Sequence, residues 1–501
     1  MKLTKIALTI AVLLGSTQAF AAPVTQGQIE AARVAGTLQQ AWISGASAPT
    51  INVYEGWVGS GAGVGCDAGT NTIFTSQAGT GTTGPNVKPG SIGNFMAYAC
   101  TRAGKVSVLY HVVDGGSLLY VAPHTVGTKL ARVKYVGTST CATSLPYVDA
   151  SNPDNSATVF KGCQQVGAAL PSTGATPASN SSNAAAVAAD PLAPQLPVGG
   201  FSDVEAALFP ATIGGGNVSS KGVESPANIG QVFGVVVSTP LYRALQAAQS
   251  LADVNATTFD PAFAPNITSQ QYVSIVATGG AYQTDWSPII PGSTKRMILA
   301  RRVDTSGTQA SSNAFFLKKP CTDAVNASFN PVKASDSTLP IGSGFEVFEG
   351  SSTGNVKTRI STAAIAGDFA IGVMSTENDW RTEASSATSG YRYVKVDGVH
   401  PEAGDVANAR VQATNGNYPF HMETVNFVRS NYAGVPAKTP FESVVVGQIT
   451  AALSSPPATS CALLPRGLTL NPLGGSVCTV GAQVMKGTVL GNNCSPYQLT
   501  Q

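Results

Sequence analysis

The chain has 501 residues, of which only 11% are charged and 43% are hydrophobic, so it can bury more than one core. Its 29 basic residues become 27 once Lys2 and Lys5 of a predicted leader are set aside, and they then balance 27 acidic residues. Zero net charge does not fit a protein that binds nucleic acid or anionic membranes, so any recognition of charge must be local.

The N-terminus has the pattern of an export signal. Lys2 and Lys5 precede an apolar run at 6–14, which is too short to span a bilayer, and Ala-Phe-Ala at 19–21 is typical of a cleavage site. We expect residues 1–21 to be removed, with no membrane insertion afterwards. The sequence therefore predicts a soluble protein that is periplasmic or secreted.

All eight cysteines follow this leader, and an even number behind an export signal indicates disulfides formed in an oxidising compartment. The chain has no Cys-x-x-Cys and its four histidines are scattered, so no metal site is expected. Pairing cysteines that are near in sequence gives Cys66–Cys100, Cys141–Cys163 and Cys461–Cys478, and leaves Cys321 and Cys494. Many other connectivities remain open.

Two early turns place small residues beside apolar segments. The segment 23–42 is mixed and mildly helical, and it leads into Gly-Ala-Ser-Ala-Pro at 45–49, whose proline suits the first turn of a helix. The second turn, Gly-Gly-Ser at 115–117, follows an apolar run at 106–113 that is typical of a strand buried on both faces. A helix is expected to start at 118–120. Ordinary connections between elements explain either turn equally well.

Two long stretches are predicted to lie outside the core. Residues 59–100 are rich in Gly, Thr and Ser and hold two cysteines, which favours a surface excursion closed by a disulfide. Residues 137–200 form a second excursion, and 171–200 is so rich in Pro, Ala, Ser and Asn that no structure is predicted for it. We interpret this stretch as a long loop within one lobe rather than a linker between domains.

Ser202 and Asp203 are predicted to open the next helix. Ser202 and Glu205 fit an S-x-x-E capping box, which accounts for Ser202 without any ligand. The box does not account for Asp203, beyond the favourable placement of an acid in a first helical turn.

Apolar strands and helical segments alternate through the rest of the chain, which indicates an α/β fold with mostly parallel sheets. Predicted strands are 231–238, 272–278, 297–300, 346–349, 369–373 and 421–428. Predicted helices are 241–251, 309–318 and 444–453, and a disulfide-rich tail covers 461–501.

The segment Arg302–Thr308, Arg-Val-Asp-Thr-Ser-Gly-Thr, is the most specific pattern in the chain. A Ser-Gly-Thr turn at a helix start leaves backbone N–H groups unpaired, with the positive end of the helix dipole behind them. Two hydroxyls and a guanidinium complete a place suited to a small tetrahedral oxyanion. A Ser/Thr N-cap beside a solvated arginine is the simpler account of this segment alone. Three earlier turns of similar chemistry favour the oxyanion.

These four turns, followed in order by Asn-Gly-Asn-Tyr-Pro at 415–419, resemble the phosphate-binding periplasmic proteins of ABC importers. The resemblance covers most of the chain after the leader, with insertions at 59–100 and 137–200, and only Arg302–Thr308 is specific. It implies the type 2 periplasmic-binding-protein fold: two α/β lobes with mixed, mostly parallel sheets flanked by helices.

The resemblance also implies a division of the chain after the leader. Lobe 1 would span 22–230, lobe 2 would span 231–416, and 417–501 would return to lobe 1 and end in the disulfide-rich tail. The protein would be a monomer without cofactor or metal. Its partners would be inorganic phosphate or a related oxyanion and an ABC permease in the membrane.

Ligand contacts implied by the resemblance are Ser47, Ala48, Gly116, Ser117, Ser202, Asp203, Arg302, Ser306, Gly307 and Thr308. Asp203 would accept a hydrogen bond from a protonated ligand oxygen, and Arg302 rather than Arg301 would pair with the oxyanion. The family usually has a bulkier residue in place of Ala48, and Pro-Leu in place of Val204 and Glu205. These departures bear on the identity of the ligand more than on the fold.

Two other functions remain open. Gly350–Gly354 fits Gly-x-Ser-x-Gly after a predicted strand, with His400 or His421 downstream, which is the order of a serine hydrolase. A plain Gly/Ser turn explains the same residues. The insertions and the zero net charge also permit a structural or adhesive extracellular protein on the same scaffold.

Overall fold

The computed structural model describes residues 22–59, 65–75, 94–113, 115–128, 130, 132–134, 145–146, 159–162, 164–166, 196–252, 260–278, 285–322, 330–335, 344–382, 390–454, 464–470 and 486–500. The predicted leader, and most of 137–200, lie outside these ranges. Within them the chain forms a mixed α/β structure around one large mixed sheet.

The helices, including short 3-10 turns labelled η, are α1 (Gln26–Val34), α2 (Thr50–Val58), η2 (Ser117–Tyr120), α3 (Ala122–Thr125), η4 (Ala206–Leu208), η5 (Ala211–Ile213), α5 (Thr239–Ala248), η6 (Pro261–Phe263), α6 (Ser269–Val276), α7 (Gly307–Leu317), α8 (Thr353–Ile365), η8 (Trp380–Thr382), α9 (Val411–Thr414) and α10 (Pro440–Ser454). None of these helices is both long enough and apolar enough to cross a bilayer.

The strands are β1 (Gln39–Gly45), β2 (Thr72–Thr75), β3 (Phe95–Arg102), β4 (Lys105–Val112), β5 (Arg132–Lys134), β6 (Leu145–Pro146), β7 (Val159–Gly162), β8 (Gln164–Val166), β9 (Gly199–Ser202), β10 (Gly222–Ser238), β11 (Asn266–Ile267), β12 (Met297–Arg302), β13 (Phe345–Gly350), β14 (Phe369–Ser375), β15 (Tyr391–Tyr393), β16 (Lys395–Val396), β17 (His421–Arg429), β18 (Leu468–Leu470), β19 (Lys486–Thr488) and β20 (Gln498–Thr500).

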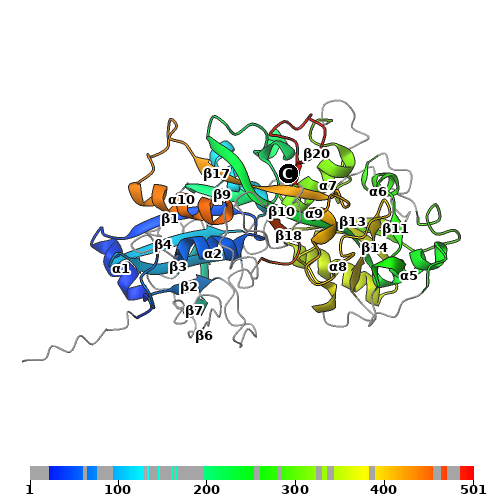
Figure 1. The fold of residues 1–501 in the computed structure, drawn as a ribbon, viewed down its shortest axis with the longest axis horizontal. Coiled ribbons are helices and arrows are strands. Elements are labelled where there is room, and N and C mark those ends of the chain that lie inside the picture. The colour runs from blue at the N-terminus through cyan, green and yellow to red at the C-terminus, as the bar shows by residue number, and fades with distance from the viewer. Residues whose placement is uncertain are drawn as a thin grey trace, which may run out of the picture.

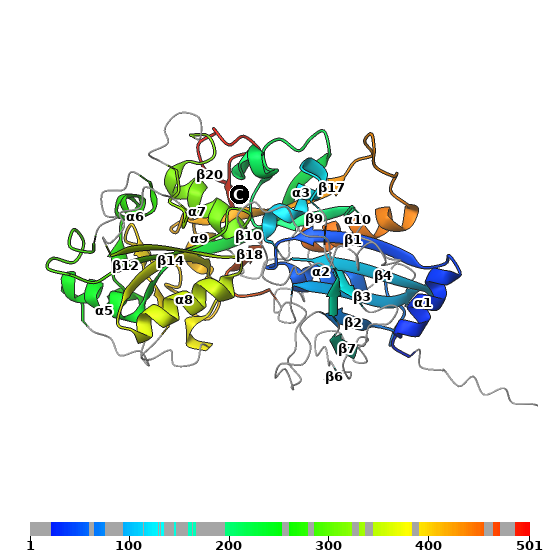
Figure 2. The same cartoon turned by 180° about the vertical axis from the view of Figure 1, so that it is seen from behind.

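The large sheet runs in the order β13-β12-β14-β10-β17-β9-β1-β4-β3-β2-β7-β6. Its elements gather into two groups at opposite ends of the long axis of the molecule (Figures 1 and 2). One group holds β1 to β4 with α1, α2 and α10, and the other holds β12 to β14 with α5 to α8. The middle of the sheet, β10 and β17, connects the two groups.

Strand β10 belongs to both groups. Its first part pairs antiparallel with β17, which in turn pairs with β9, and its last part pairs antiparallel with β14 and β15. The pairing with β17 shifts register between Pro226 and Gly230, where proline has no N–H to donate to the ladder. One continuous strand therefore carries the sheet from one group of elements to the other.

Each group buries apolar side chains between helices and the sheet. In the first, α2 (through Tyr54 and Trp57) and α10 (through Ile449) pack in one cluster with the sheet residues Ile43 and Leu109. In the second, α8 contributes to a separate cluster with β12 and β14, while α7 joins the largest apolar cluster, which also includes residues of the first group. This burial is the main favourable contribution to folding and fixes where each helix begins relative to the strands.

The prediction of mostly parallel sheets is wrong for the described strands. Parallel pairs occur on either side of β1 and on either side of β12. Two further parallel pairs are β2 with β7 and β11 with β16, which makes six. The described strands form ten antiparallel pairs, four of them made by β10. Alternation of strands and helices along the sequence indicates crossovers, but it does not show the direction in which a returning strand such as β17 enters the sheet.

The structure corrects several further expectations. Tyr272–Thr278 was predicted as a strand, but residues 269–276 form α6, whose capping box joins Thr268 and Gln271. Residues 59–100 were expected at the surface, yet β2 and most of β3 are buried strands of the large sheet. The strand predicted at 231–238 is the last part of β10, which begins at Gly222, and the helix predicted to open at Ser202 is only the 3-10 turn η4. The other predicted strands and helices occur within a few residues of their expected positions.

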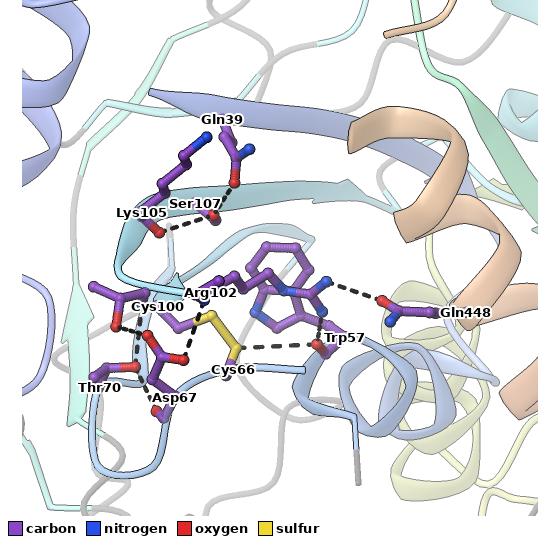
Figure 3. Close-up of a disulfide and its surroundings, with 12 residues drawn as sticks. Gln39, Trp57, Cys66, Asp67, Thr70, Cys100, Arg102, Lys105, Ser107 and Gln448 are labelled. Carbon is purple, nitrogen blue, oxygen red and sulfur yellow. Dashed lines mark hydrogen bonds between the residues drawn. A yellow bond between two sulfur atoms is a disulfide. The ribbon is translucent and has the colours of Figure 1, made fainter. Parts of the chain in front are cut away.

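Two disulfides lie in the described part of the chain. Cys66–Cys100 confirms the local pairing, and Figure 3 shows it beside the buried side chain of Arg102. Cys321 pairs with Cys494, the two cysteines that local pairing had left over. Cys141, Cys163, Cys461 and Cys478 lie outside the described residues.

Candidate functional site

Three helices begin at one pocket, and each directly follows a strand of the large sheet. The pairs are β1 with α2, β12 with α7, and β13 with α8. The pocket has a volume of about 240 Å³ and is lined by residues from the first turn or the preceding loop of each helix. Helix starts attract anions through the positive ends of their dipoles, so this space is favourable for a negatively charged ligand.

Eight of the ten residues predicted as ligand contacts line this pocket. They are Ser47, Ala48, Gly116, Ser117, Asp203, Arg302, Ser306 and Thr308. Ser202 and Gly307 are not among its lining residues. The structure thus brings together turns that are far apart in sequence, at the place where the two groups of elements meet.

Arg302 is the last residue of β12 and its guanidinium is held in a fixed direction. It donates to Thr353 Oγ1 (2.8 Å) and to the Ser351 carbonyl (3.0 Å), both at the start of α8. Its Nε is buried and has no hydrogen-bond partner among the described residues. Burial lowers the pKa of Arg302 to about 10, and nearby Asp203 and Glu377 oppose this, so the side chain stays charged at neutral pH.

Arg301, the rival for this role, is directed elsewhere. Neighbouring residues of a strand face opposite sides of the sheet, and Arg301 pairs with Asp304 and donates to the Val332 carbonyl (2.7 Å). Asp304 also pairs with Lys333 (2.5 Å). Asp304 therefore belongs to this ion-pair network, which stabilises the turn before α7.

Asp203 follows β9 and reaches the pocket beside the start of α7. Its Oδ2 accepts a hydrogen bond from Ser117 Oγ (2.8 Å), while its buried Oδ1 has no hydrogen-bond partner among the described residues. Burial raises the pKa of Asp203, and the Ser117 hydrogen bond and the charge of Arg302 work against that rise. An unsatisfied carboxylate oxygen in a buried pocket is costly, so this oxygen is suited to a ligand that can donate a hydrogen bond.

Gly307 lets the start of α7 lie close to Ser117 and Asp203. Its N–H donates to Ser117 Oγ (3.1 Å), so Ser117 links the start of α7 to Asp203. A Cβ at position 307 would lie 2.5 Å from Ser117 Oγ and 2.6 Å from Asp203 Oδ2. The residue must therefore be glycine for α7 to approach this closely, and its N–H is used within the protein rather than aimed at the pocket.

The predicted capping box at Ser202 is wrong. Ser202 is the buried last residue of β9 and its Oγ accepts from the Val204 N–H (3.2 Å) in a tight turn. The carboxylate of Glu205 instead accepts from the Val489 N–H (2.7 Å) and the Gly491 N–H (2.7 Å) of the C-terminal segment. A distant segment of the chain thus takes up the side chain that the local pattern assigned to a helix cap.

Several lining residues had no place in the predicted site: Thr50, Asn94, Val113, Gly115, Gln231, Ser351–Gly354, Ser375 and Glu377. Glu377 follows β14 and accepts from Ser375 Oγ (3.1 Å). Burial and, after it, the like charge of Asp203 raise the pKa of Glu377 to about 7. The sequence holds no local signal for Glu377, because only the placement of β14 beside β12 brings it to the pocket.

The segment Gly350–Gly354, considered above as a hydrolase motif, lies at the start of α8. Ser352 is the N-cap residue, and its hydroxyl accepts from the Asn355 N–H (3.2 Å) within a capping box. In the part of the chain that the structure describes, no histidine lines the pocket. Buried His400 accepts from the Glu402 N–H through Nδ1 (3.1 Å) and contacts the Tyr393 carbonyl through Nε2 (3.1 Å).

The pocket therefore offers neutral donors, one cation and two acids. Hydroxyl groups come from Ser47 and Ser306, and the Ser306 side chain makes no capping hydrogen bond of its own, whereas the Ser117 hydroxyl donates to Asp203. Among the described residues, no cluster of His, Cys, Asp and Glu is arranged to hold a metal ion. The chemistry that these groups support is recognition of a small, polar, partly protonated anion.

Comparison with known proteins adds little to this geometry. No family model matches the chain, and no curated protein matches it. A solved structure described as a possible phosphate binding protein from Planctomyces limnophilus DSM 3776 matches with 12% identity and a TM-score of 0.25, over 52% of this chain and 82% of the other. A likeness this weak carries no argument about fold or function.

Proposed function

We propose that this protein is an exported solute-binding protein that captures phosphate or a similar tetrahedral oxyanion in a cleft between two lobes. The observation that carries the proposal is the convergence of three helix N-termini and Arg302 on one pocket. Helix N-termini bind anions through unpaired N–H groups, and a fixed guanidinium adds charge-assisted hydrogen bonds. A volume of about 240 Å³ suits a small ligand with some of its water.

The two groups of elements on either side of β10 would be the two lobes. Ser47, between β1 and α2, comes from one group, and Arg302, at the end of β12, comes from the other, so the ligand would contact both. Binding between two lobes is the arrangement in which a ligand stabilises a closed state. The proposed domain boundaries at 230 and 416 follow from this interpretation.

Transport is the use we infer for such capture. An exported binding protein would deliver the oxyanion to an ABC permease, and the predicted leader and the disulfides support a location in the periplasm or outside the cell. We propose no chemical step on the ligand. The hydroxyl of Ser352 caps a helix, which favours a structural role for Gly350–Gly354 over a hydrolase nucleophile.

Calorimetric titration of the chain without residues 1–21 tests the proposal directly. We expect phosphate and arsenate to bind with one site per chain at pH 7 and sulfate to bind more weakly. A ligand that binds only the folded protein adds about 2.7 kcal/mol to the free energy of unfolding at a concentration of 100 times its Kd, so the melting temperature should rise with phosphate.

Two results would count against the proposal. If none of the three anions binds or raises the melting temperature, the structural or adhesive alternative is favoured. If a general serine-hydrolase inhibitor labels Ser352 in the folded protein, an enzymatic role returns. Peptide mass spectrometry after labelling would locate the modified residue.

A further inference from the structure

We propose, on the basis of the oxyanion function above, that Glu377 couples ligand binding to the uptake of one proton. The pocket would then hold a divalent oxyanion together with that proton, in a hydrogen bond between the Glu377 carboxyl and a ligand oxygen. Glu377 would be a specificity-determining residue because, once protonated, it donates to an unprotonated ligand oxygen, whereas Asp203 accepts from a protonated one.

The first support is the charge balance of the pocket wall. Its charged lining residues in the described chain are Arg302, Asp203 and Glu377, which is one cation against two acids. A divalent oxyanion would add two further negative charges to a buried space, where charges are weakly screened. The helix N-termini supply only about half a charge each, so taking up a proton relieves much of the remaining repulsion.

The second support is the difference between the two acids. Asp203 is stabilised in its ionised form by the Ser117 hydroxyl and by Arg302. Glu377 has one weaker contact, the hydroxyl of Ser375 at 3.1 Å, and is influenced by Asp203 as a like charge. Of the two carboxyls, Glu377 is therefore the one that accepts the proton, and burial together with the like charge of Asp203 raises its pKa to about 7.

Other charged groups near Glu377 do not remove this effect. Lys357 of α8 and Arg302 of β12 both lower the pKa of Glu377, but by less than burial and Asp203 raise it. Tyr393 of β15 is buried, and its pKa is raised so far that it stays neutral. Arg466 donates to the carbonyl of neighbouring Thr376, and its charge is shared with Glu402.

Protonation also changes what the carboxyl can do. An ionised carboxylate only accepts hydrogen bonds, so it opposes an unprotonated ligand oxygen, whereas a carboxylic acid donates one. Asp203 accepts and protonated Glu377 donates, so the two acids would take complementary roles toward one ligand. A ligand without an exchangeable proton could use only the hydrogen bond that protonated Glu377 donates.

The experiment measures proton uptake as phosphate binds. Calorimetry at pH 8 in buffers with different heats of ionisation gives the number of protons taken up per ligand. We expect a value close to one for the unaltered protein and close to zero for Glu377→Gln. Above pH 7 the affinity of the unaltered protein should fall about tenfold per pH unit, since one proton is bound with the ligand, and this slope should flatten in the variant.

Glu346→Gln is the matched control, because Glu346 of β13 pairs with Arg359 of α8 and is not among the lining residues of the pocket. It should retain both the proton uptake and the pH slope. Phosphate binding without proton uptake in the unaltered protein overturns this inference but leaves the proposed function standing. Undiminished uptake in Glu377→Gln assigns the proton to the ligand or Asp203 and also overturns it. If no oxyanion binds at any pH, both proposals fall together.

Discussion

Arg102 and Arg302 are both the last residue of a strand, and burial lowers the pKa of each to about 10. Their surroundings differ. The Arg102 guanidinium lies 4.1 Å from the centre of the Trp57 ring and donates to Gln448 Oε1 (2.9 Å) and the Trp57 carbonyl, next to Cys66–Cys100 (Figure 3). Arg302 is held by polar atoms of the α8 start and borders the pocket.

This difference shows what separates a structural arginine from a recognition arginine. Residue type, position on the strand and change in pKa are the same for both. An indole covers one face of Arg102, and the side chain ties α2, β3 and α10 together, whereas Arg302 faces a cavity that it shares with two acids. The surroundings of the guanidinium therefore carry the functional information.

The largest effect on stability is expected from Arg102→Ala. It would leave a space beside Trp57 and remove one hydrogen bond to Gln448, and large-to-small changes at buried positions cost about 2–5 kcal/mol. Urea unfolding measures this loss. Phosphate affinity of the folded variant should be unchanged, and an unfolding midpoint equal to that of the parent would show that Arg102 has no structural role.

Arg302→Ala should have an effect of similar size on phosphate binding rather than on stability. Removing the single pocket-lining cation of the described chain leaves the anion with neutral donors and two acids, which should cost about 2–5 kcal/mol in binding free energy. Calorimetry with phosphate measures the change, and thermal unfolding should show little difference. Arg301→Ala is the control, because Arg301 pairs with Asp304 away from the pocket. If Arg301→Ala loses affinity and Arg302→Ala does not, the assignment of the two arginines is wrong.

Asp203→Asn tests selectivity and should change it by about 1–3 kcal/mol, the usual cost of an unsatisfied buried polar group. The free oxygen of Asp203 can only accept, so it favours protonated phosphate over sulfate. Asparagine can donate, so sulfate binding should strengthen while phosphate binding weakens modestly. Titration with both anions gives the ratio of affinities, and an unchanged ratio would remove Asp203 from the recognition of the ligand.

Thr353→Ala is expected to have the smallest effect. It removes one hydrogen bond that orients Arg302, worth about 0.5–1.5 kcal/mol. Phosphate affinity should fall slightly and should recover in Thr353→Ser, which restores the hydroxyl. A loss as large as that of Arg302→Ala would mean that Thr353 itself contacts the ligand.

Local patterns predicted the parts of this molecule that depend on neighbouring residues. The strand ending at Arg302, the turn after it and the start of α7 follow from a buried apolar run and small capping residues. The turn at Gly116 and Ser117 was visible for the same reason. A matching signal for α6 was present and missed, because Thr268 and Gln271 form a capping box at its start.

Features that depend on distant parts of the chain could not be predicted in this way. Glu205 is bound by the C-terminal segment at Val489, so its fit to a local capping pattern was misleading. Glu377 reaches the pocket only through the order of strands in the sheet. The direction of β17 depends on where the returning chain enters that sheet, and no residue of β17 records it.

The continuous strand β10 has a mechanical consequence. Its two ends are held by different neighbours, β17 and β14. Sliding either end along its neighbour would break successive hydrogen bonds, whereas bending β10 across the sheet keeps them. Bending of β10 should be easiest between Pro226 and Gly230, because the hydrogen-bond ladder with β17 is interrupted there. Movement of the pocket walls should therefore be a small rocking about these residues, and stiffening them should slow the entry and exit of a ligand while leaving its contacts intact.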